Sequence, residues 1–197
     1  MKEISLKGTR QPELGQKGMA ALELAFLLPL LLIMVLWIID FGRLVQASLI
    51  VTNVSREGGS IISRGINSGE NFLDMLQASG VPLDLNGAGR IYATRIAAGA
   101  SASQPDPSID TAHQLSRGSL AVNSRIRDDL AHLGVSEALY QHLRFEDAPQ
   151  NTSDIAEVWV VEVYYLYRPI TPLPDLVNNL LITPGHDGRV IGSRSVF

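Results

Sequence analysis

The stretch Lys17-Gly-Met-Ala-Ala-Leu-Glu23, followed by the apolar run from Leu24 to Ile39, decides the fold of this chain. The run contains no charged residue, and Trp37 carries its only side-chain N–H or O–H group. Counted from Met19, the apolar segment is 21 residues long. As a helix it is long enough to cross a hydrocarbon core of roughly 30 Å. The sequence therefore predicts one membrane span at about residues 19–39.

Two residues in this segment are unusual for a plain membrane anchor. Glu23 lies one helical turn inside it, where an ionised carboxylate is costly and is therefore usually functional. Pro29 lacks the N–H that would bond to the carbonyl of Ala25, so we predict a kink in the helix there. A removable secretory signal is an alternative, with a weak cleavage site at Val45-Gln46-Ala47. The length of the apolar core favours retention over removal.

The uneven distribution of charge predicts the topology. The first 18 residues contain four basic and two acidic groups, whereas the chain from Asp40 onward contains 12 Arg and 17 Asp plus Glu. The positive-inside rule then places the N-terminus in the cytoplasm and the C-terminal part outside. An acidic outer part without a basic patch argues against nucleic-acid binding. The chain of 197 residues has no cysteine, which excludes disulfides, a thiol nucleophile and a cysteine zinc site.

The helix is predicted to continue beyond the membrane. Apolar and small residues recur at steps of three and four from Leu44 to Ile62, so we expect one helix from about Leu22 to Arg64, with Gly65 as its C-cap. The lower half of this stripe is expected to pack against the C-terminal domain, and the upper half to be left for other subunits.

Periodicity and turn residues divide the remainder into short elements. Residues 155–168 are apolar on both faces of an alternating pattern, which is typical of a central strand covered on both sides. The predicted fold class is α+β, with a long N-terminal transmembrane helix packed on a small C-terminal α+β domain. The other predicted elements are helices at 70–79, 119–133, 135–143 and 176–182, strands at 90–97 and 189–197, and a surface loop at 99–110.

Four sequence segments carry a resemblance to a known family. They are GMAALELAFLLPL from Gly18, IDFGR from Ile39, TNVSREG from Thr52 and YLYRPITP from Tyr165. As a set they resemble the TadE-like family, the minor pilins or pseudopilins of the tight-adherence (Tad, Flp) pilus system. Leu24 departs from the family pattern, in which an aromatic residue more often follows the glutamate.

The resemblance implies a structural protein rather than an enzyme, with an architecture like that of type IV pilins and without a cofactor. It implies a cytoplasmic leader at residues 1–18, cleavage between Gly18 and Met19 by a prepilin peptidase, a long helix at 19–64 and an extracytoplasmic domain at 65–197. After cleavage, Glu23 could pair with the Met19 ammonium of its own subunit or of a neighbouring pilin, and we expect the N-terminus of an adjacent subunit to be its partner. The alternative is that Glu23 is only tolerated at the headgroup interface. The implied location is the bacterial inner membrane or the pilus. The implied partners are the other Tad minor pilins, the major pilin, the assembly platform and membrane lipid.

Catalytic or binding interpretations have weaker support in the sequence. Asp128 and His132 are spaced for one face of a helix, but no third metal ligand has a supporting spacing. Tyr164, Tyr165 and Tyr167 could form a recognition surface, although strand aromatics are more often core residues. The alternative function is a membrane-anchored extracytoplasmic domain that binds a ligand or hydrolyses a substrate.

Overall fold

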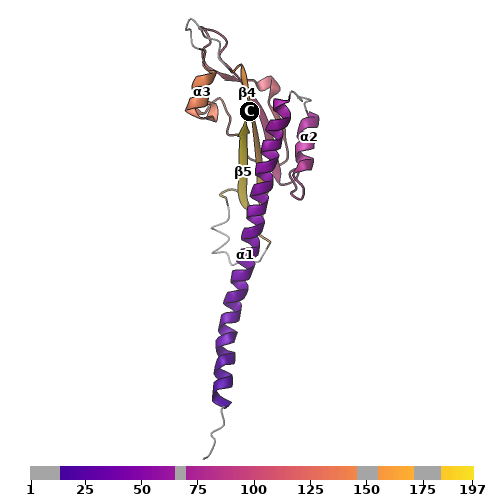
Figure 1. Ribbon diagram of the computed structural model, residues 1–197, viewed down its shortest axis with the longest axis vertical. Helices are drawn as coiled ribbons and strands as arrows, with labels where there is room; N and C mark the ends of the chain where they lie inside the picture. The colour runs from indigo at the N-terminus through magenta and orange to yellow at the C-terminus, as the bar shows by residue number, and fades with distance from the viewer. Residues whose placement is uncertain (1–13, 65–69, 146–154, 171–182) are drawn as a thin grey trace, which may run out of the picture.

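The computed structural model describes residues 14–64, 70–145, 155–170 and 183–197. Its longest element is α1 (Leu14–Ser63), a helix of 50 residues that extends well beyond the rest of the molecule (Figure 1). At 1.5 Å per residue α1 is about 75 Å long. The prediction of one long helix is confirmed, although the helix begins before Leu22. Gly65, the predicted cap, lies outside the described residues.

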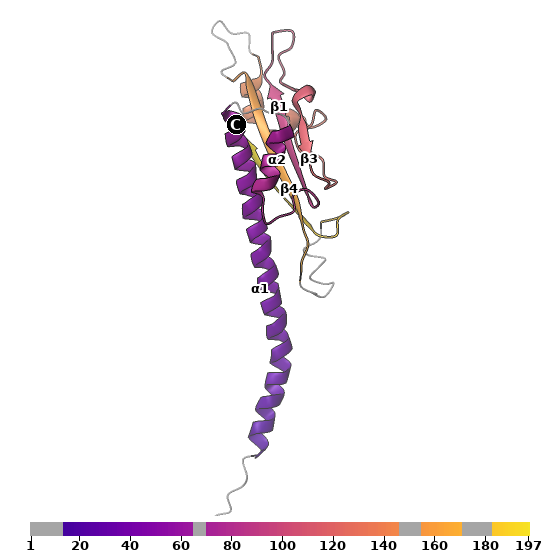
Figure 2. The same ribbon diagram turned by 90° about the vertical axis from the view of Figure 1, so that its right-hand side faces the viewer.

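Pro29 lies inside α1 and does not end it. The helix curves gently along its free part rather than breaking (Figure 2). A proline in a helix removes one backbone hydrogen bond, and a helix that can relax around it bends instead of stopping.

The sheet is antiparallel and has the strand order β2-β1-β4-β5, with β3 also paired to β1. The central pair is β1 (Gly89–Ala97) and β4 (Glu157–Tyr167), in a register that places Tyr92 opposite Glu162. The C-terminal strand β5 (Arg189–Val196) pairs with the other edge of β4. The short strands β2 (Ser108–Ile109) and β3 (Leu115–Arg117) complete the sheet beyond β1.

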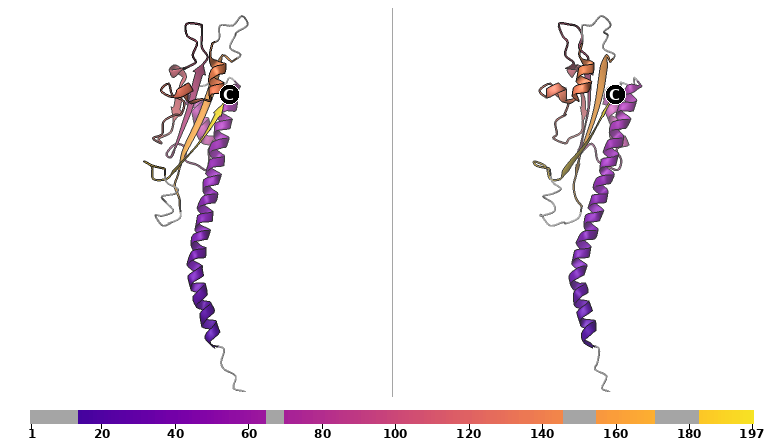
Figure 3. Two further views of the ribbon diagram at one scale, coloured as in Figure 1. Left: turned by 90° about the vertical axis from the view of Figure 1, so that its left-hand side faces the viewer. Right: turned by 60° about the vertical axis from the view of Figure 1, so that its left-hand side comes forward.

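β4 is buried on both faces, as its alternating apolar pattern predicts. Trp159, Val161 and Val163 point to the face covered by α1 and by α2 (Glu70–Ser79). Val158 and Val160 point to the opposite face, where Ile126, Leu133 and Leu143 cover them. The sheet is thus the middle of three layers, with α1 along one side and the segment that ends in α3 (Glu137–Leu143) along the other (Figure 3).

The stripe on the second half of α1 is buried against the domain over its whole length. Ala47, Val51, Val54 and Ile62 are each less than a tenth exposed. The prediction that the upper half of this stripe is left for other subunits is therefore wrong. This half of the stripe is buried because α1 and the end of the chain approach each other closely at Gly59. A Cβ on Gly59 would lie 1.6 Å from the ring of Phe197. The missing side chain lets the last turns of the helix lie against the end of β5.

Residues 119–133 do not form the predicted helix. Their backbone is irregular until the 3₁₀ turn η2 (Ala131–Gly134), in which His132 and Leu133 have positive φ of 52° and 57°. The cause is competition for backbone donors: the Ile126 N–H bonds to the Ser124 hydroxyl, and the Arg125 N–H bonds to the Glu162 carboxylate. The apolar residues of this segment still belong to the core, but each packs on the sheet individually and not as part of one helix face.

Of the remaining predicted elements, two helices and two strands are confirmed, and one loop is partly wrong. The helix at 70–79 is confirmed by α2 and the helix at 135–143 by α3, whose N-cap is Ser136. The strands at 90–97 and 189–197 are confirmed by β1 and β5. The surface loop at 99–110 is wrong at its end, where β2 pairs with β1. The helix predicted at 176–182 lies outside the described residues.

Candidate functional site

The free half of α1 exposes an apolar surface that contains no charged residue from Leu24 to Ile39. The exposed fraction is 41% for Trp37 and 78% for Phe26. Apolar area in water is unfavourable by roughly 25 cal/mol per Å², so this surface needs an apolar environment. Among the described residues, α1 is the one helix long and apolar enough to cross a membrane. A single-pass membrane protein fits this arrangement.

The residues predicted for processing and assembly lie at the start of this exposed surface. A Cβ built on Gly18 would meet no atom within 4 Å, and Met19 is 66% exposed. Glu23 is also exposed, one helical turn further on. It forms no hydrogen bond or ion pair with any part of the chain that the structure describes. The structure therefore places Gly18, Met19 and Glu23 on adjacent turns near the start of α1, where all three are exposed.

Asp40 is the first charged residue after the apolar run, and it fastens α1 to the sheet. Its side chain is only 1% exposed. The Tyr167 hydroxyl donates to the Asp40 carbonyl at 2.9 Å and to its Oδ1 at 3.3 Å, and the Ile170 N–H donates to Oδ1 at 3.0 Å. We call this group of Asp40, Tyr167 and Ile170 the helix–sheet latch. It joins two of the segments that the sequence resemblance singled out, IDFGR and YLYRPITP.

Replacing Asp40 with alanine is expected to lower the free energy of unfolding by about 1–3 kcal/mol, because the buried Tyr167 hydroxyl and the partly buried Ile170 N–H would both lose the Asp40 carboxylate as an acceptor. Chemical unfolding in detergent, followed by near-UV circular dichroism, measures this change. Asp129→Ala is the control, because its ion pair with Arg127 is exposed and contributes about 0–1 kcal/mol. Equal losses in the two variants would contradict a buried latch.

Because of Tyr167, the latch is expected to make the protein less stable at alkaline pH. Desolvation, followed by the charge and hydrogen bond of Asp40, raises the pKa of Tyr167 to about 12. The folded state therefore binds more protons than the unfolded state between about pH 10 and about pH 12, and stability falls as pH rises through that window. We expect Tyr167→Phe to be less stable at neutral pH yet to lose less stability on alkaline titration. Wild-type and variant melting temperatures that fall in parallel would contradict this expectation.

A second buried carboxylate lies on the far face of the sheet. Glu162 is completely buried and accepts hydrogen bonds from the Ser124 hydroxyl, from the Arg125 N–H at 3.0 Å and from the Tyr164 hydroxyl at 2.9 Å. Burial first, and then the negative charge of Glu162, raises the pKa of Tyr164. Glu162 therefore fastens the irregular segment at 124–126 to the centre of β4. The signal in the sequence is an acidic residue in the middle of an apolar strand, and the alternating pattern alone does not identify it as functional.

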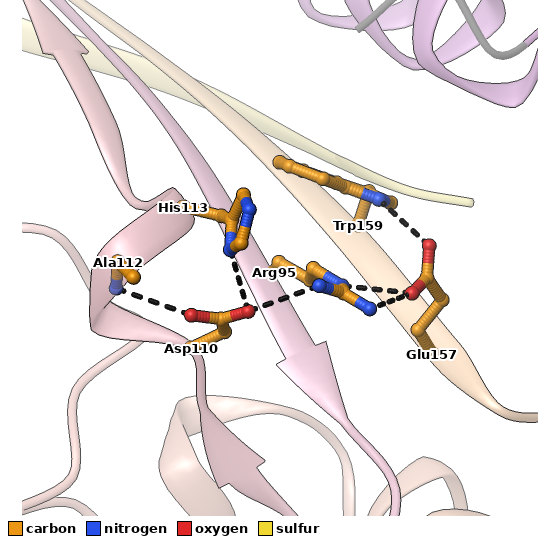
Figure 4. A network of polar contacts seen from close by, with 6 residues as sticks. All are labelled: Arg95, Asp110, Ala112, His113, Glu157 and Trp159. Carbon is orange, nitrogen blue, oxygen red and sulfur yellow. Dashed lines mark hydrogen bonds and ion pairs between the residues drawn. The ribbon is translucent and has the colours of Figure 1, made fainter.

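An exposed polar network occupies the far end of β1 and β4 (Figure 4). Arg95 contacts Asp110 at 3.0 Å and Glu157 through its Nε at 2.7 Å, and the Trp159 indole donates to Glu157. Desolvation acts to raise the pKa of Asp110, but the hydrogen bond and charge of His113 outweigh it and hold that pKa below its usual value. Exposed pairs of this kind contribute about 0–1 kcal/mol each. The network links the ends of β1 and β4 to the turn at 110–113.

The other candidate groups do not assemble into a site. Asp128 and His132 are not on one helix, and the His132 ring lies 5.1 Å from the Tyr140 ring. Across the described ranges, no three His, Asp or Glu side chains are grouped so that they could hold a metal ion. Tyr164 and Tyr167 are buried, and Tyr165 is partly buried and packs against the core, so the three tyrosines do not form one exposed surface.

The fold and the site define a protein with one apolar membrane helix that continues into, and is fastened to, a small α+β domain. Residues 18–60 match the model of the TadE-like protein family. The predicted resemblance is confirmed for this N-terminal segment, which includes Gly18, Glu23, Pro29 and Asp40. The comparison with curated proteins found no match. The comparison with solved structures found none either.

Proposed function

We propose that this chain is a TadE-like minor pilin of a tight-adherence pilus. The observation that carries the proposal is α1 itself. Its residues 18–60 match the TadE-like family, and it changes at Asp40 from an exposed apolar helix to one packed on a sheet. In this proposal the N-terminus is cytoplasmic, α1 crosses the inner membrane, and the domain at 65–197 lies in the periplasm or in the extracellular pilus.

Processing is the first step of the proposed function. A prepilin peptidase cuts between Gly18 and Met19 and removes residues 1–18. Gly18 has open space around it on α1, and glycine has no Cβ to obstruct a peptidase at the membrane edge. The mature chain then begins at Met19, with a new ammonium group four residues before Glu23.

Assembly with other pilins is the second step. Glu23 is exposed within the apolar surface, and a carboxylate in hydrocarbon requires a partner or becomes protonated. The Met19 ammonium of a neighbouring pilin provides the opposite charge at the matching depth. Pairing of these groups sets the axial register of docking. The major pilin, the other minor pilins and the assembly platform are the partners in this proposal.

The experiment that tests the function is fractionation of cells of the source bacterium into sheared fibres and membranes, followed by intact-mass measurement of the chain. The expected result is a chain beginning at Met19 that co-purifies with other pilins. A full-length chain in membranes, with an active prepilin peptidase and no associated pilin, would overturn the proposal. The alternative is an anchored binding or hydrolytic domain, and for hydrolysis with a bound metal the described residues contain no group of three His, Asp or Glu side chains that could hold the ion.

Replacing Glu23 with glutamine is expected to permit insertion and cleavage but to lower co-assembly about tenfold, since a charge-assisted hydrogen bond contributes about 1.5–3 kcal/mol. Pull-down of the processed variant with other pilins measures this change. Glu57→Gln is the control, because Glu57 is an exposed acid on the same helix beyond the membrane span. Wild-type partner recovery in the Glu23 variant would leave only an interfacial role for that carboxylate.

A further inference from the structure

A cavity lies at the junction of α1 and the sheet, beside the helix–sheet latch. Its volume is about 310 Å³. This is at the lower end of the range for ligand pockets, roughly 300–1,000 Å³. Arg43 and Gln46 of α1 line one wall, and Tyr165 and Arg168 at the end of β4 line the other. Ile50 and Leu83 contribute apolar surface, so the cavity offers two guanidinium groups above an apolar lining.

The cavity lies at the depth of lipid headgroups if α1 spans a membrane. Arg43 follows the last residue of the apolar segment, Ile39, by four positions, or about 6 Å along the helix axis. The interfacial layer on each side of a bilayer is roughly 5–8 Å thick. Trp37 and Phe41 mark the same boundary, since their exposed rings stack at 6.2 Å and aromatic side chains collect at membrane interfaces.

Among the residues that the structure describes, the charges around the cavity leave one guanidinium without an anionic partner. Arg168 pairs with Asp187 at 2.8 Å, and the Asp40 carboxylate is turned into the latch. Arg43 forms no ion pair with the residues that the structure describes. A guanidinium group presents a planar fork that matches the oxygens of a phosphate.

We propose that this cavity binds the phosphate of an anionic phospholipid from the leaflet on which the domain rests. Arg43 binds the phosphate oxygens, Arg168 adds a second positive charge from the opposite wall, and the apolar lining accepts the glycerol end of the lipid. The bound headgroup then holds the domain at a fixed height on the membrane. This inference rests on membrane insertion of α1 and is independent of whether the chain enters a pilus.

The test uses the full chain in nanodiscs that contain phosphatidylglycerol and phosphatidylcholine in equal amounts, followed by detergent release and native mass spectrometry. The wild-type chain is expected to retain phosphatidylglycerol in preference to phosphatidylcholine. Arg43→Gln is expected to reduce that preference about tenfold, as loss of a charge-assisted contact implies. Asp187→Asn is expected to increase retention, because it removes the anion that competes for Arg168.

Two matched variants distinguish lipid binding at this cavity from general electrostatic attraction between arginine side chains and anionic lipid. Arg56→Gln removes the same charge from an exposed position of α1, about 20 Å further along the helix, and is expected to retain lipid as the wild type does. Arg43→Lys keeps the charge but loses the planar fork, so it is expected to lose most of the preference. Full retention in Arg43→Lys, or equal losses in Arg43→Gln and Arg56→Gln, would overturn the site. Displacement of the lipid by excess inorganic phosphate would overturn a lipid ligand in favour of the free anion.

Discussion

Replacing Gly18 with leucine is expected to leave residues 1–18 attached to nearly every copy of the chain. The substitution places a branched side chain at the bond that the proposed peptidase must reach, whereas glycine leaves the backbone open. The helix itself has room for the change, since a Cβ at Gly18 meets no atom within 4 Å. The expected loss therefore lies in processing and not in folding. Intact-mass measurement of the membrane-extracted protein distinguishes the two forms.

Gly42→Leu is the matched control for this experiment. Gly42 is also exposed on α1, and a Cβ there also meets nothing within 4 Å. It lies beyond the membrane span, so the variant is expected to be processed as the wild type is. Normal trimming of the Gly18 variant would show that cleavage does not depend on this glycine.

Replacing Glu162 with alanine is expected to lower the free energy of unfolding by about 3–5 kcal/mol. The buried Ser124 and Tyr164 hydroxyls and the partly buried Arg125 N–H would remain around a cavity without their acceptor. Each unsatisfied group costs about 1–3 kcal/mol. An unfolding free energy of about 5–15 kcal/mol is ordinary for a protein, so this single change brings the domain close to instability. Urea unfolding of the detergent-solubilised chain measures the loss.

Two variants make the Glu162 experiment specific. Glu157→Ala removes an acid from the same strand, but from its exposed end, and is expected to lose no more than about 1 kcal/mol. Glu162→Gln keeps one carbonyl acceptor and is expected to lie between the alanine variant and the wild type. If the Glu157 and Glu162 alanine variants were equally stable, Glu162 would not hold the 124–126 segment to β4.

The elements predicted correctly from the sequence are those in which burial has a regular period. α1 and β4 are buried along a stripe and on two faces respectively, so spacing alone identifies them. The segment at 119–133 has helical spacing at Leu120, Ile126 and Leu133 but no helix, since Ser124 and Glu162 take its backbone donors. Local spacing cannot reveal an acceptor that arrives from another strand.

The candidate site was predictable only in part, for a related reason. Gly18, Met19 and Glu23 are close in sequence, so their grouping follows from one helical turn. The latch joins Asp40 to Tyr167, residues 127 positions apart. Both lie in segments that resemble the family, but nothing in either segment shows that the two meet. Glu162 was missed because a single acid in a strand gives no indication of the donors around it.

The way α1 lies on the sheet determines how the protein would respond to tension. α1 runs alongside β4 and β5 for the length of the domain, with the Ser55 hydroxyl 3.0 Å from that of Ser193 (Figure 3). A pull on the membrane end of α1 would slide the helix past the strands rather than peel it away one residue at a time. The latch at Asp40 and the ring of Phe197 against Gly59 stand at opposite ends of this contact. Separation would require the contacts at both ends and the apolar packing between them to break at the same time. This is expected of a junction that transmits force along its helix.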